Sequence, residues 1–489
     1  MKVTDFQSAM FFWFILLFIF YLLIYYRQKH GYWKKFGLKG PLPVPFLGTS
    51  YVYLRRPLHV VETELIQKYG QIVGMFEGAK PTLLVSDPEF IKTIALKEFH
   101  SFPQSFTFSS YKHPLEQLFP ELIWGSKWKH SRGQITQCFT VAKLRKAFPM
   151  IEKCSDMCVK SLADEIQRCD AIEMKSFWFK YYCDTIFQFC LNLDAHVYQS
   201  RDNIIVEKMI DLSRPFIPAF IMNMFLPEWI MKTFHLSALD KKALDYLEKL
   251  VTHLIETRRL RKDERQTDVL NRLIAINETS SEQSTEIELV AAIVDLLFNG
   301  FETSSSLLAW CSWRLAFNQD VQDRLTKEID SLNSLDYDSL LSAQYLDAVI
   351  SESLRIDPPE THNERVCHTT YHHPETGIVI PAGSKVSMPI YAMHHNPDNF
   401  PDPEKFNPDR FLPDNRNAIK PFTYIPFGVG YRACLGTKYA LLVSKMALAK
   451  LLQSYRFVVT PSTTIDLDYD WGSILLCADE INVGIEKRM

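Results

Sequence analysis

The ten cysteines of this 489-residue chain include no C-x-x-C pair and no dense cluster. A disulfide framework is therefore not indicated, and we expect a reduced domain that faces the cytosol. An excess of one sign of charge is also lacking, because the formal net charge is −3. This balance disfavours a protein that binds nucleic acid over its whole surface, so charge has to be considered locally.

Histidines at a zinc-like spacing are missing as well. The adjacent pairs His372–His373 and His394–His395 have no further ligands at the spacing that a zinc site requires. We expect exposed loop histidines at both pairs. The chain shows no internal repeat, and its length is sufficient for a large core in one or two domains.

One long uncharged run is present near the N-terminus. Ala9–Tyr26 (AMFFWFILLFIFYLLIYY) approaches the roughly 20 apolar residues that span a bilayer as a helix. The positive-inside rule places the rest of the chain in the cytosol. A cleaved signal peptide is the alternative, but YYRQKHGYW offers no small-residue cleavage site. The basic residues after the run are Arg27, Lys29, Lys34, Lys35 and Lys39, against Lys2 and Asp5 before it.

The rest of the chain predicts a large, mainly α fold with a small β portion. Most of the middle has helical periodicity, and GPLPVP at residues 40–45 predicts a stiff connection to the anchor. Extended pieces are expected at Thr82–Ser86 and Gly377–Met388, where Pro381-Ala382-Gly383 suits a hairpin turn.

The segment PFGVGYRACLGTKYA holds the most informative cysteine, Cys434. FTYIPFGVG before it resembles a short strand that enters a glycine turn, and TKYALLVSKMALAKLLQSY after it has helical periodicity. A helix N-terminus favours a thiolate, which can act as a nucleophile or as an iron ligand. Since no general base lies nearby, we favour the ligand.

This segment resembles the haem-binding loop of the cytochrome P450 superfamily, in which a cysteine thiolate holds haem iron. The matching order is F-x-x-G-x-R-x-C-x-G. The resemblance implies that Cys434 is the metal ligand and that haem b is the cofactor. It also implies haem contacts for Phe427, Gly430, Arg432 and Gly436.

The longest helical pattern, from Ile287 to about Asn318, has a polar interruption at Asn299–Ser304. Gly300 loosens a helix, and a threonine hydroxyl can bond a backbone carbonyl and open it further. We therefore expect a buried pocket with an acid and a hydroxyl, Glu302 and Thr303.

This interruption is similar to the oxygen-binding helix of the same superfamily. The similarity implies that Thr303 hydrogen-bonds dioxygen and that Glu302 relays protons, which makes both catalytic. Asn299 departs from the alanine or glycine that is usual at its position. Its amide would assist peroxide chemistry or shape the pocket.

Glu352 and Arg355 form an E-x-x-R pattern, which also occurs at Glu165–Arg168 and Glu256–Arg259 and is weak by itself. This occurrence differs from the other two because Pro358-Pro359 follows it directly and FNPDRF follows at residues 406–411. With Arg410, it resembles the buried Glu–Arg–Arg network of the superfamily, which braces the cysteine loop. We expect a structural role.

Four residues resemble those that contact the haem propionates in the superfamily: Trp128, Arg132, Arg365 and Arg432. From Leu122 to Ile151 the chain has basic residues and no acid, which predicts either a solvated face or a docking surface for an acidic electron donor. These basic residues are Lys127, Lys129, Arg132, Lys143, Arg145 and Lys146.

Pro215–Phe234 is too polar to span a membrane and unusually apolar for a surface loop. It suits an access lid that dips into the bilayer, or else a buried core segment. Other pocket residues are expected in Ser105–Phe119, near Asn299, in Glu360–Asn363 and in Gly472–Leu475.

The resemblance covers the chain after the anchor, and YWKKFGLKGP, FETSS and ERVC are nearest the animal subgroup that handles xenobiotics and steroids. It implies a monooxygenase of the endoplasmic reticulum membrane that acts on lipophilic small molecules. Electrons would come from NADPH through a reductase, with a cytochrome b-type donor as a second candidate. The expected division is an anchor at 1–26, a linker at 27–45 and a catalytic domain at 46–489.

Two alternatives stay open at this point. A haem-thiolate isomerase or dehydratase of hydroperoxides is supported by Asn299 and opposed by Glu302 and Thr303. A non-catalytic, membrane-tethered haem- or lipid-binding protein would have no need for that acid–threonine pair. No nucleic acid is expected as a partner.

Overall fold

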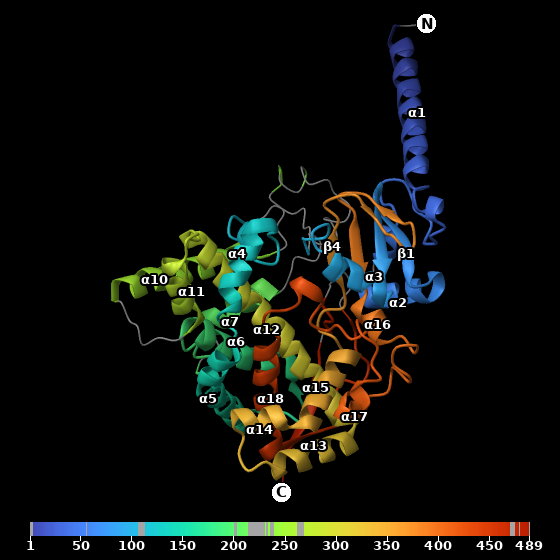
Figure 1. The fold of residues 1–489 in the computed structure, drawn as a ribbon. Coiled ribbons are helices and arrows are strands. Elements are labelled where there is room, and N and C mark those ends of the chain that lie inside the picture. The colour runs from blue at the N-terminus through green and yellow to red at the C-terminus, as the bar shows by residue number, and fades with distance from the viewer. Residues whose placement is uncertain are drawn as a thin grey trace.

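Helices form most of the molecule, and a small sheet lies at one side of it (Figure 1). The structure is a computed structural model. It describes residues 3–54, 56–105, 113–199, 203–213, 230, 233–234, 239–261, 268–469, 475–478 and 480–488. The mainly α fold with a small β portion is confirmed.

The long helix α12 (Glu286–Phe317) crosses the helical part of the molecule. A capping box between Thr285 and Glu288 fixes its start. Its apolar residues pack against α6 (Met174–Leu191), and the indole N–H of Trp178 donates to the hydroxyl oxygen of Ser312 at 3.0 Å. The helix expected from Ile287 is confirmed to within one residue at each end.

The other main helices surround α12 and share one large core. Among them, α18 packs against both α5 and α15, so the helix that follows Cys434 lies within this core. They are α4 (Gly125–Thr136), α5 (Val141–Glu165), α7 (Ile204–Ser213), α10 (Lys241–Arg261), α11 (Val269–Thr279), α13 (Gln319–Ser331), α15 (Gln344–Ile356) and α18 (Thr437–Ser454).

Shorter helices connect these elements. They are η1 (Trp33–Phe36), η2 (Ser50–Tyr53), α2 (Leu58–Tyr69), α3 (Pro88–Lys92), η3 (Thr93–Lys97), η4 (Glu116–Leu118), α14 (Tyr337–Ser342), α16 (Ile390–His394), η5 (Pro408–Phe411), α17 (Pro413–Arg416) and η6 (Gly430–Arg432). Two of them, η2 and α2, contact the main sheet.

The main sheet has the strand order β1-β2-β7-β4. Its strands are β1 (Ile72–Glu77), β2 (Lys80–Val85), β4 (Asn363–Val366) and β7 (Lys385–Met388). The β2–β7 pair is parallel, and the other two pairs are antiparallel. A second sheet joins β3 (Ile172–Glu173), β9 (Asn482–Lys487) and β8 (Tyr455–Val458).

The hairpin expected around Pro381-Ala382-Gly383 is wrong, although the extended pieces beside it are present. The turn exists, with Gly383 at a φ of 83°. The strand before it, β6 (Val379–Ile380), pairs with β5 (Tyr371–His372), whereas β7 pairs with β2 and β4. The two strands on either side of the turn therefore pair with other strands and not with each other.

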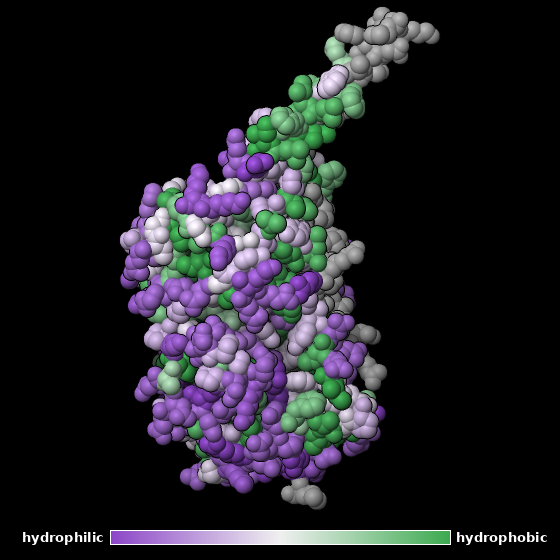
Figure 2. All heavy atoms as spheres, turned by 90° about the vertical axis from the view of Figure 1, so that its right-hand side faces the viewer, coloured by the Kyte–Doolittle hydropathy of each residue, from purple (hydrophilic) through white to green (hydrophobic). Residues whose placement is uncertain are grey.

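The N-terminal helix α1 (Val3–Lys29) projects away from the body (Figure 1). Its apolar side chains are exposed, with Phe11 and Leu17 at 68% and 65%. Figure 2 shows apolar atoms of the projecting helix above a body whose visible surface is largely hydrophilic. By length and composition this helix is able to cross a membrane.

Candidate active site

Cys434 lies in the loop between η6 and α18. Its backbone N–H donates to the carbonyl oxygen of Phe427 at 2.8 Å, which closes the loop. Gly430 has a φ of 74°, and an added Cβ would approach the carbonyl oxygen of Ala95 to 2.2 Å, so only glycine fits there. The helix expected after Cys434 is confirmed, with its start at Thr437.

The strand-like run expected before Cys434 is wrong, because residues 422–429 form turns and irregular backbone. The backbone N–H of Ile425 donates to the side chain of His394 at 3.0 Å rather than to a neighbouring strand. A side-chain acceptor therefore takes the place of a strand partner.

The Cys434 side chain is exposed, and the protein packed around it raises the pKa of its thiol by desolvation. Hydrogen bonds from the backbone of Gly436 and from Thr437 act in the opposite direction, and the net shift is upward. These hydrogen bonds and the charge of Arg132 act in the direction expected at a helix N-terminus, although burial outweighs them. A raised pKa disfavours a free nucleophile, whereas a bound metal ion deprotonates a thiol outright.

Arg432 of η6 is held by three backbone carbonyls and one aromatic ring. It donates to Pro103 at 2.9 Å, to Pro120 at 3.2 Å and to Ile123 at 2.7 Å. The guanidinium carbon lies 4.3 Å from the centre of the Trp128 ring of α4. Trp128 and Arg432, both expected to contact the haem propionates, are therefore neighbours.

Arg132 and Arg365 reach the same loop from two other elements. Arg132 of α4 donates to the carbonyl oxygen of Ala433 at 2.7 Å. Arg365 of β4 donates to the carbonyl oxygen of Val429 at 3.3 Å. The structure thus brings the three expected arginines to the segment that carries the cysteine.

The charge of this arginine cluster fits an anionic ligand. Burial, together with repulsion from Arg365 and Arg132, lowers the pKa of Arg432 to about 9. Burial also lowers the pKa of Arg365 to about 10, and within the described residues its buried Nε has no hydrogen-bond partner. Because buried like charges and unpaired donors are unfavourable, two carboxylates beside them would be stabilising. These residues therefore fit the two propionates of haem, next to a sulfur able to bind its iron.

Thr303 and Asn299 lie one turn apart on α12. The hydroxyl of Thr303 donates to the carbonyl oxygen of Asn299 at 2.8 Å, which confirms the expected contact. The expected opening of the helix is wrong, because α12 is continuous. Gly300 serves close packing instead, since an added Cβ would approach Cδ1 of Ile186 on α6 to 2.9 Å.

Glu302 is a buried acid, as expected, but it has a partner that the motif does not reveal. Its carboxylate lies 2.7 Å from Nζ of Lys175 on α6, which also donates to Cys477 at 3.6 Å. Burial by itself would lower the pKa of Lys175. Attraction to Glu302 and Cys477 is stronger than this effect, so the pKa of Lys175 is raised. No sequence signal identifies Lys175, because it lies outside every motif.

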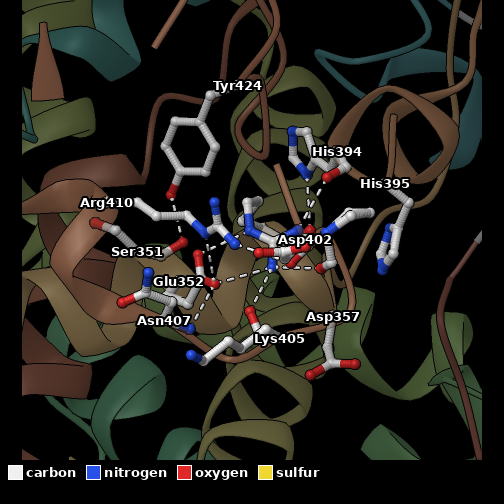
Figure 3. A network of polar contacts seen from close by, with 12 residues as sticks. Ser351, Glu352, Asp357, His394, His395, Asp402, Lys405, Asn407, Arg410 and Tyr424 are labelled. Carbon is white, nitrogen blue, oxygen red and sulfur yellow. Dashed lines mark hydrogen bonds and ion pairs between the residues drawn. The ribbon is translucent and has the colours of Figure 1, made fainter. Parts of the chain in front are cut away.

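Glu352, Arg355 and Arg410 form the expected buried network. Figure 3 shows Glu352 and Arg410 within it. Arg355 Nε lies 2.7 Å from a carboxylate oxygen of Glu352, and both side chains are fully buried. Arg410 Nε lies 3.4 Å from the other oxygen, which also accepts the backbone N–H of Asn407 at 2.9 Å. By contrast, Arg259 in the E-x-x-R at Glu256–Arg259 is partly exposed.

His394 connects this network to the cysteine loop. Its carbonyl oxygen accepts a hydrogen bond from the Arg355 guanidinium at 2.9 Å, and its Nε2 accepts one from the backbone N–H of Ile425 at 3.0 Å. Three of the four histidines in the two pairs are buried and structural, so the expectation of exposed loop histidines is wrong for them. The buried members are His373, His394 and His395.

Another set of metal-ligating side chains, His113, Asp245 and Glu248, lies away from these histidines. The backbone N–H of Leu115 donates to His113 Nδ1 at 3.2 Å, so in the neutral ring Nε2 carries the proton and faces Asp245 at 2.9 Å. Lys241 also pairs with Asp245, at 2.7 Å. Since these groups already satisfy one another, we assign them to packing of α10.

The basic segment from Lys127 to Lys146 lies beside the cysteine loop, because Arg132 within it bonds to that loop. Arg145 pairs with Asp338 at 2.6 Å, so part of the positive charge has a partner.

The expected lid, Pro215–Phe234, lies outside the described residues except for positions 230, 233 and 234. Parts of the expected pocket, 106–112 and 472–474, also lie outside them.

Comparison with known proteins agrees with this geometry. The family described as Cytochrome P450 matches residues 38–484, which include the cysteine loop, α12 and the Glu–Arg–Arg network. Cytochrome P450 3A28 of Bos taurus is 32% identical over 464 residues, 91% of this chain and 90% of the relative. Cytochrome P450 3A12 of Canis lupus familiaris is 32% identical, and cytochrome P450 3A5 of Homo sapiens 31%, each over 96% of this chain and 94% of the relative. The chain belongs to the cytochrome P450 family.

Proposed function

We propose that Cys434 is the axial ligand of haem iron and that Arg132, Arg365 and Arg432 bind the haem propionates. The observation that carries this proposal is the convergence of one thiol and three buried or half-buried arginines on a single loop. In this arrangement the chain is a haem-thiolate monooxygenase, which inserts one atom of dioxygen into a lipophilic small molecule.

Haem, when bound, supplies the redox chemistry that activates dioxygen with two electrons, and the second oxygen atom leaves as water. The protein supplies ligation, proton delivery and the shape of the pocket. The carboxylate of Glu302 is the proton-transfer group, and Nζ of Lys175, 2.7 Å from it, fixes its position. The Thr303 hydroxyl, bonded to Asn299 at 2.8 Å, is the next polar group along α12.

The electron donor is an NADPH-dependent reductase that docks on the basic segment, with a cytochrome b-type protein as a second donor. The exposed lysines Lys127, Lys129 and Lys146 support this role, and Arg132 joins the same segment to the cysteine loop. Electrons delivered there arrive beside the iron ligand.

The protein resides in the endoplasmic reticulum membrane through residues 1–26. Residues 27–45 form a basic and proline-rich linker, and residues 46–489 form the catalytic domain in the cytosol. The exposed apolar helix α1 and the basic residues in its last turn, Arg27 and Lys29, support this topology.

An isomerase or dehydratase of hydroperoxides is less well supported than the monooxygenase. Its only support was the amide of Asn299, which donates to Asp295 at 3.0 Å and thus has a partner within the helix. A non-catalytic binding protein leaves the Glu302–Lys175 pair without a role. Substrate turnover that requires NADPH and reductase separates the three functions.

The ligand assignment is tested with Cys434→Ser. We expect the variant to lose the red-shifted Soret band of the reduced carbonyl complex, because a serine oxygen does not replace the thiolate. Cys169→Ser is the control, since Cys169 is exposed and lies outside the loop. Retention of the band in Cys434→Ser, in protein with normal haem content, would contradict the assignment.

A further inference from the structure

Several apolar side chains are exposed on the surface beside the C-terminal end of α1. Leu42 is 78% exposed, Phe46 59% and Leu54 40%. The hydroxyl of Tyr51 donates to the carbonyl oxygen of Leu42 at 2.9 Å, which holds η2, and with it Leu54, beside residues 42–46. Scattered apolar residues are ordinary on a protein surface, whereas a group of them marks an interaction site. We name this group the 42–54 patch, and its members are Leu42, Val44, Pro45, Phe46 and Leu54.

The 42–54 patch touches α1 at the end of its uncharged run. The ring centroids of Phe46 and Tyr26 lie 5.1 Å apart. Tyr26 is the last residue of the uncharged run, and Arg27 follows it. Aromatic residues at the end of a membrane-spanning helix lie between the hydrocarbon and the headgroups of the bilayer, and the basic residues beyond them lie on the cytosolic side. A bilayer crossed by α1 would therefore have its boundary at the level of Phe46.

Contacts between the segment after α1 and the main sheet fix this arrangement. The indole N–H of Trp33 donates to the carbonyl oxygen of Met75 at 2.8 Å. The backbone N–H of Gly74 donates to the carbonyl oxygen of Lys39 at 2.9 Å. An added Cβ at Gly74 would approach the Trp33 side chain to 2.7 Å, so the two residues fit closely. The segment after α1 is thus packed on the body, which holds the 42–54 patch in place beside the helix.

The chain around the 42–54 patch is basic. The sequence contains no aspartate or glutamate from Phe6 to Val61. Beyond this stretch, Glu62 is buried and Glu64 pairs with Arg56. Anionic lipids attract lysine and arginine to the cytoplasmic membrane surface, whereas a symmetric pair of copies would bring the same lysines together. Charge therefore favours lipid over a second copy of the chain as the partner of the patch. The exposed lysines between α1 and the patch are Lys34, Lys35 and Lys39.

We propose that the 42–54 patch is a second membrane-contact surface, which enters the headgroup region of the leaflet from which α1 emerges. Apolar surfaces of this kind lie about 5–10 Å into the boundary between headgroups and acyl chains. The body then has two points of attachment, so the membrane holds it in one orientation instead of leaving it free to swing about α1. This inference rests on the proposed anchoring by α1.

The test places a tryptophan in the patch of the haem-loaded full-length chain, in nanodiscs of phosphatidylcholine and phosphatidylserine. Leu42→Trp is the probe. Leu341→Trp is the matched control, because Leu341 is 52% exposed and lies on α14, toward the end of the body opposite α1 (Figure 1). Lipids brominated on their acyl chains then replace the ordinary lipids. We expect the emission added by Leu42→Trp to be quenched at least about twofold more than that added by Leu341→Trp, because bromine quenches groups that enter the lipid.

A second variant removes the apolar character of the patch and leaves α1 unchanged. Leu54→Trp is also expected to be quenched. Adding Leu42→Asp and Phe46→Asp is expected to reduce this quenching to the level of Leu341→Trp, because charged side chains enter lipid unfavourably. Carbonate washing should leave both proteins in the membrane, since α1 is intact. Because the replaced side chains are exposed, haem content is expected to stay unchanged.

Equal quenching of Leu42→Trp and Leu341→Trp, in chains that resist carbonate washing, would overturn the inference and leave the proposed anchoring intact. Release of the wild type by carbonate would instead contradict the anchoring on which the inference rests. An emission of Leu42→Trp that is not quenched by brominated lipid, but shifts as the protein concentration rises in detergent, would assign the patch to contact between copies and would also overturn the inference.

Discussion

At the scale of single residues, one side-chain type takes different roles according to its surroundings. Cys183 and Cys190 lie fully buried in α6, where they pack as small apolar groups. Cys434 lies in a glycine-rich loop, beside a helix N-terminus and Arg132. The motif around Cys434 made this distinction predictable, whereas Lys175 could not be predicted because its partner Glu302 is distant in sequence.

The role of Thr303 is tested with Thr303→Ala. The variant is expected to bind substrate and consume NADPH, while product formed per NADPH falls at least about tenfold and hydrogen peroxide is released instead. The reason is that alanine lacks the hydroxyl proposed to place a proton during turnover. Thr303→Ser keeps that hydroxyl and is expected to behave as the wild type. An unchanged ratio of product to NADPH in Thr303→Ala would refute the role.

At the scale of elements, periodicity predicts helices well and strand partners poorly. The apolar pattern gave α12 to within one residue at each end. The run before Cys434 and the turn at Gly383 were predicted as strand and hairpin, because local sequence does not contain the identity of the partner. Ile425 bonds to His394, and β6 pairs with β5, through contacts that only the tertiary fold creates.

The Glu–Arg–Arg network is expected to stabilise the element that carries the cysteine loop. Glu352→Gln leaves the buried guanidinium of Arg355 without its charged partner, which commonly costs about 3–5 kcal/mol of unfolding free energy. We expect earlier denaturant unfolding and reduced haem content. Arg259→Leu is the control, since the pair that it breaks is partly exposed and is expected to cost about 1 kcal/mol or less. Equal losses in both variants would contradict a special role for the network.

The basic segment is tested by reversing the charge of Lys127 and Lys143 to Glu. We expect slower reductase-driven first electron transfer, most clearly at low salt, because long-range attraction is screened beyond about 8 Å at physiological ionic strength. Substrate binding and turnover with added peroxide should not change. Reversal of Lys242 and Lys327, exposed on α10 and α13, is the matched control. An equal effect of both double variants, or an equal loss of peroxide-driven turnover, would exclude docking at this segment.

At the scale of the whole molecule, an exposed apolar helix projects from a body whose surface is largely hydrophilic. The helix α1 projects from the side of the body near the β1 sheet, and the C-terminus lies at the opposite end (Figure 1). Polar contacts hold its C-terminal end to the sheet side, since His30 bonds to the carbonyl oxygen of Gly78 at 2.9 Å. Insertion of α1 in a bilayer, as proposed, would therefore constrain how the rest of the chain approaches the membrane.

The proposed topology is tested in sealed microsomes. Carbonate washing is expected to leave the chain in the membrane, because the exposed apolar surface of α1 is removed from water only in lipid. Added protease is expected to digest the body and to leave a short, membrane-protected fragment that contains α1, since Arg27 and Lys29 favour a cytosolic C-terminal side. A variant with acidic residues at positions 27, 29, 34 and 35 is expected to insert with mixed orientation, and detergent should abolish protection in every case. A body protected from protease without detergent, or an N-terminus trimmed after Tyr26, would reverse the proposed topology.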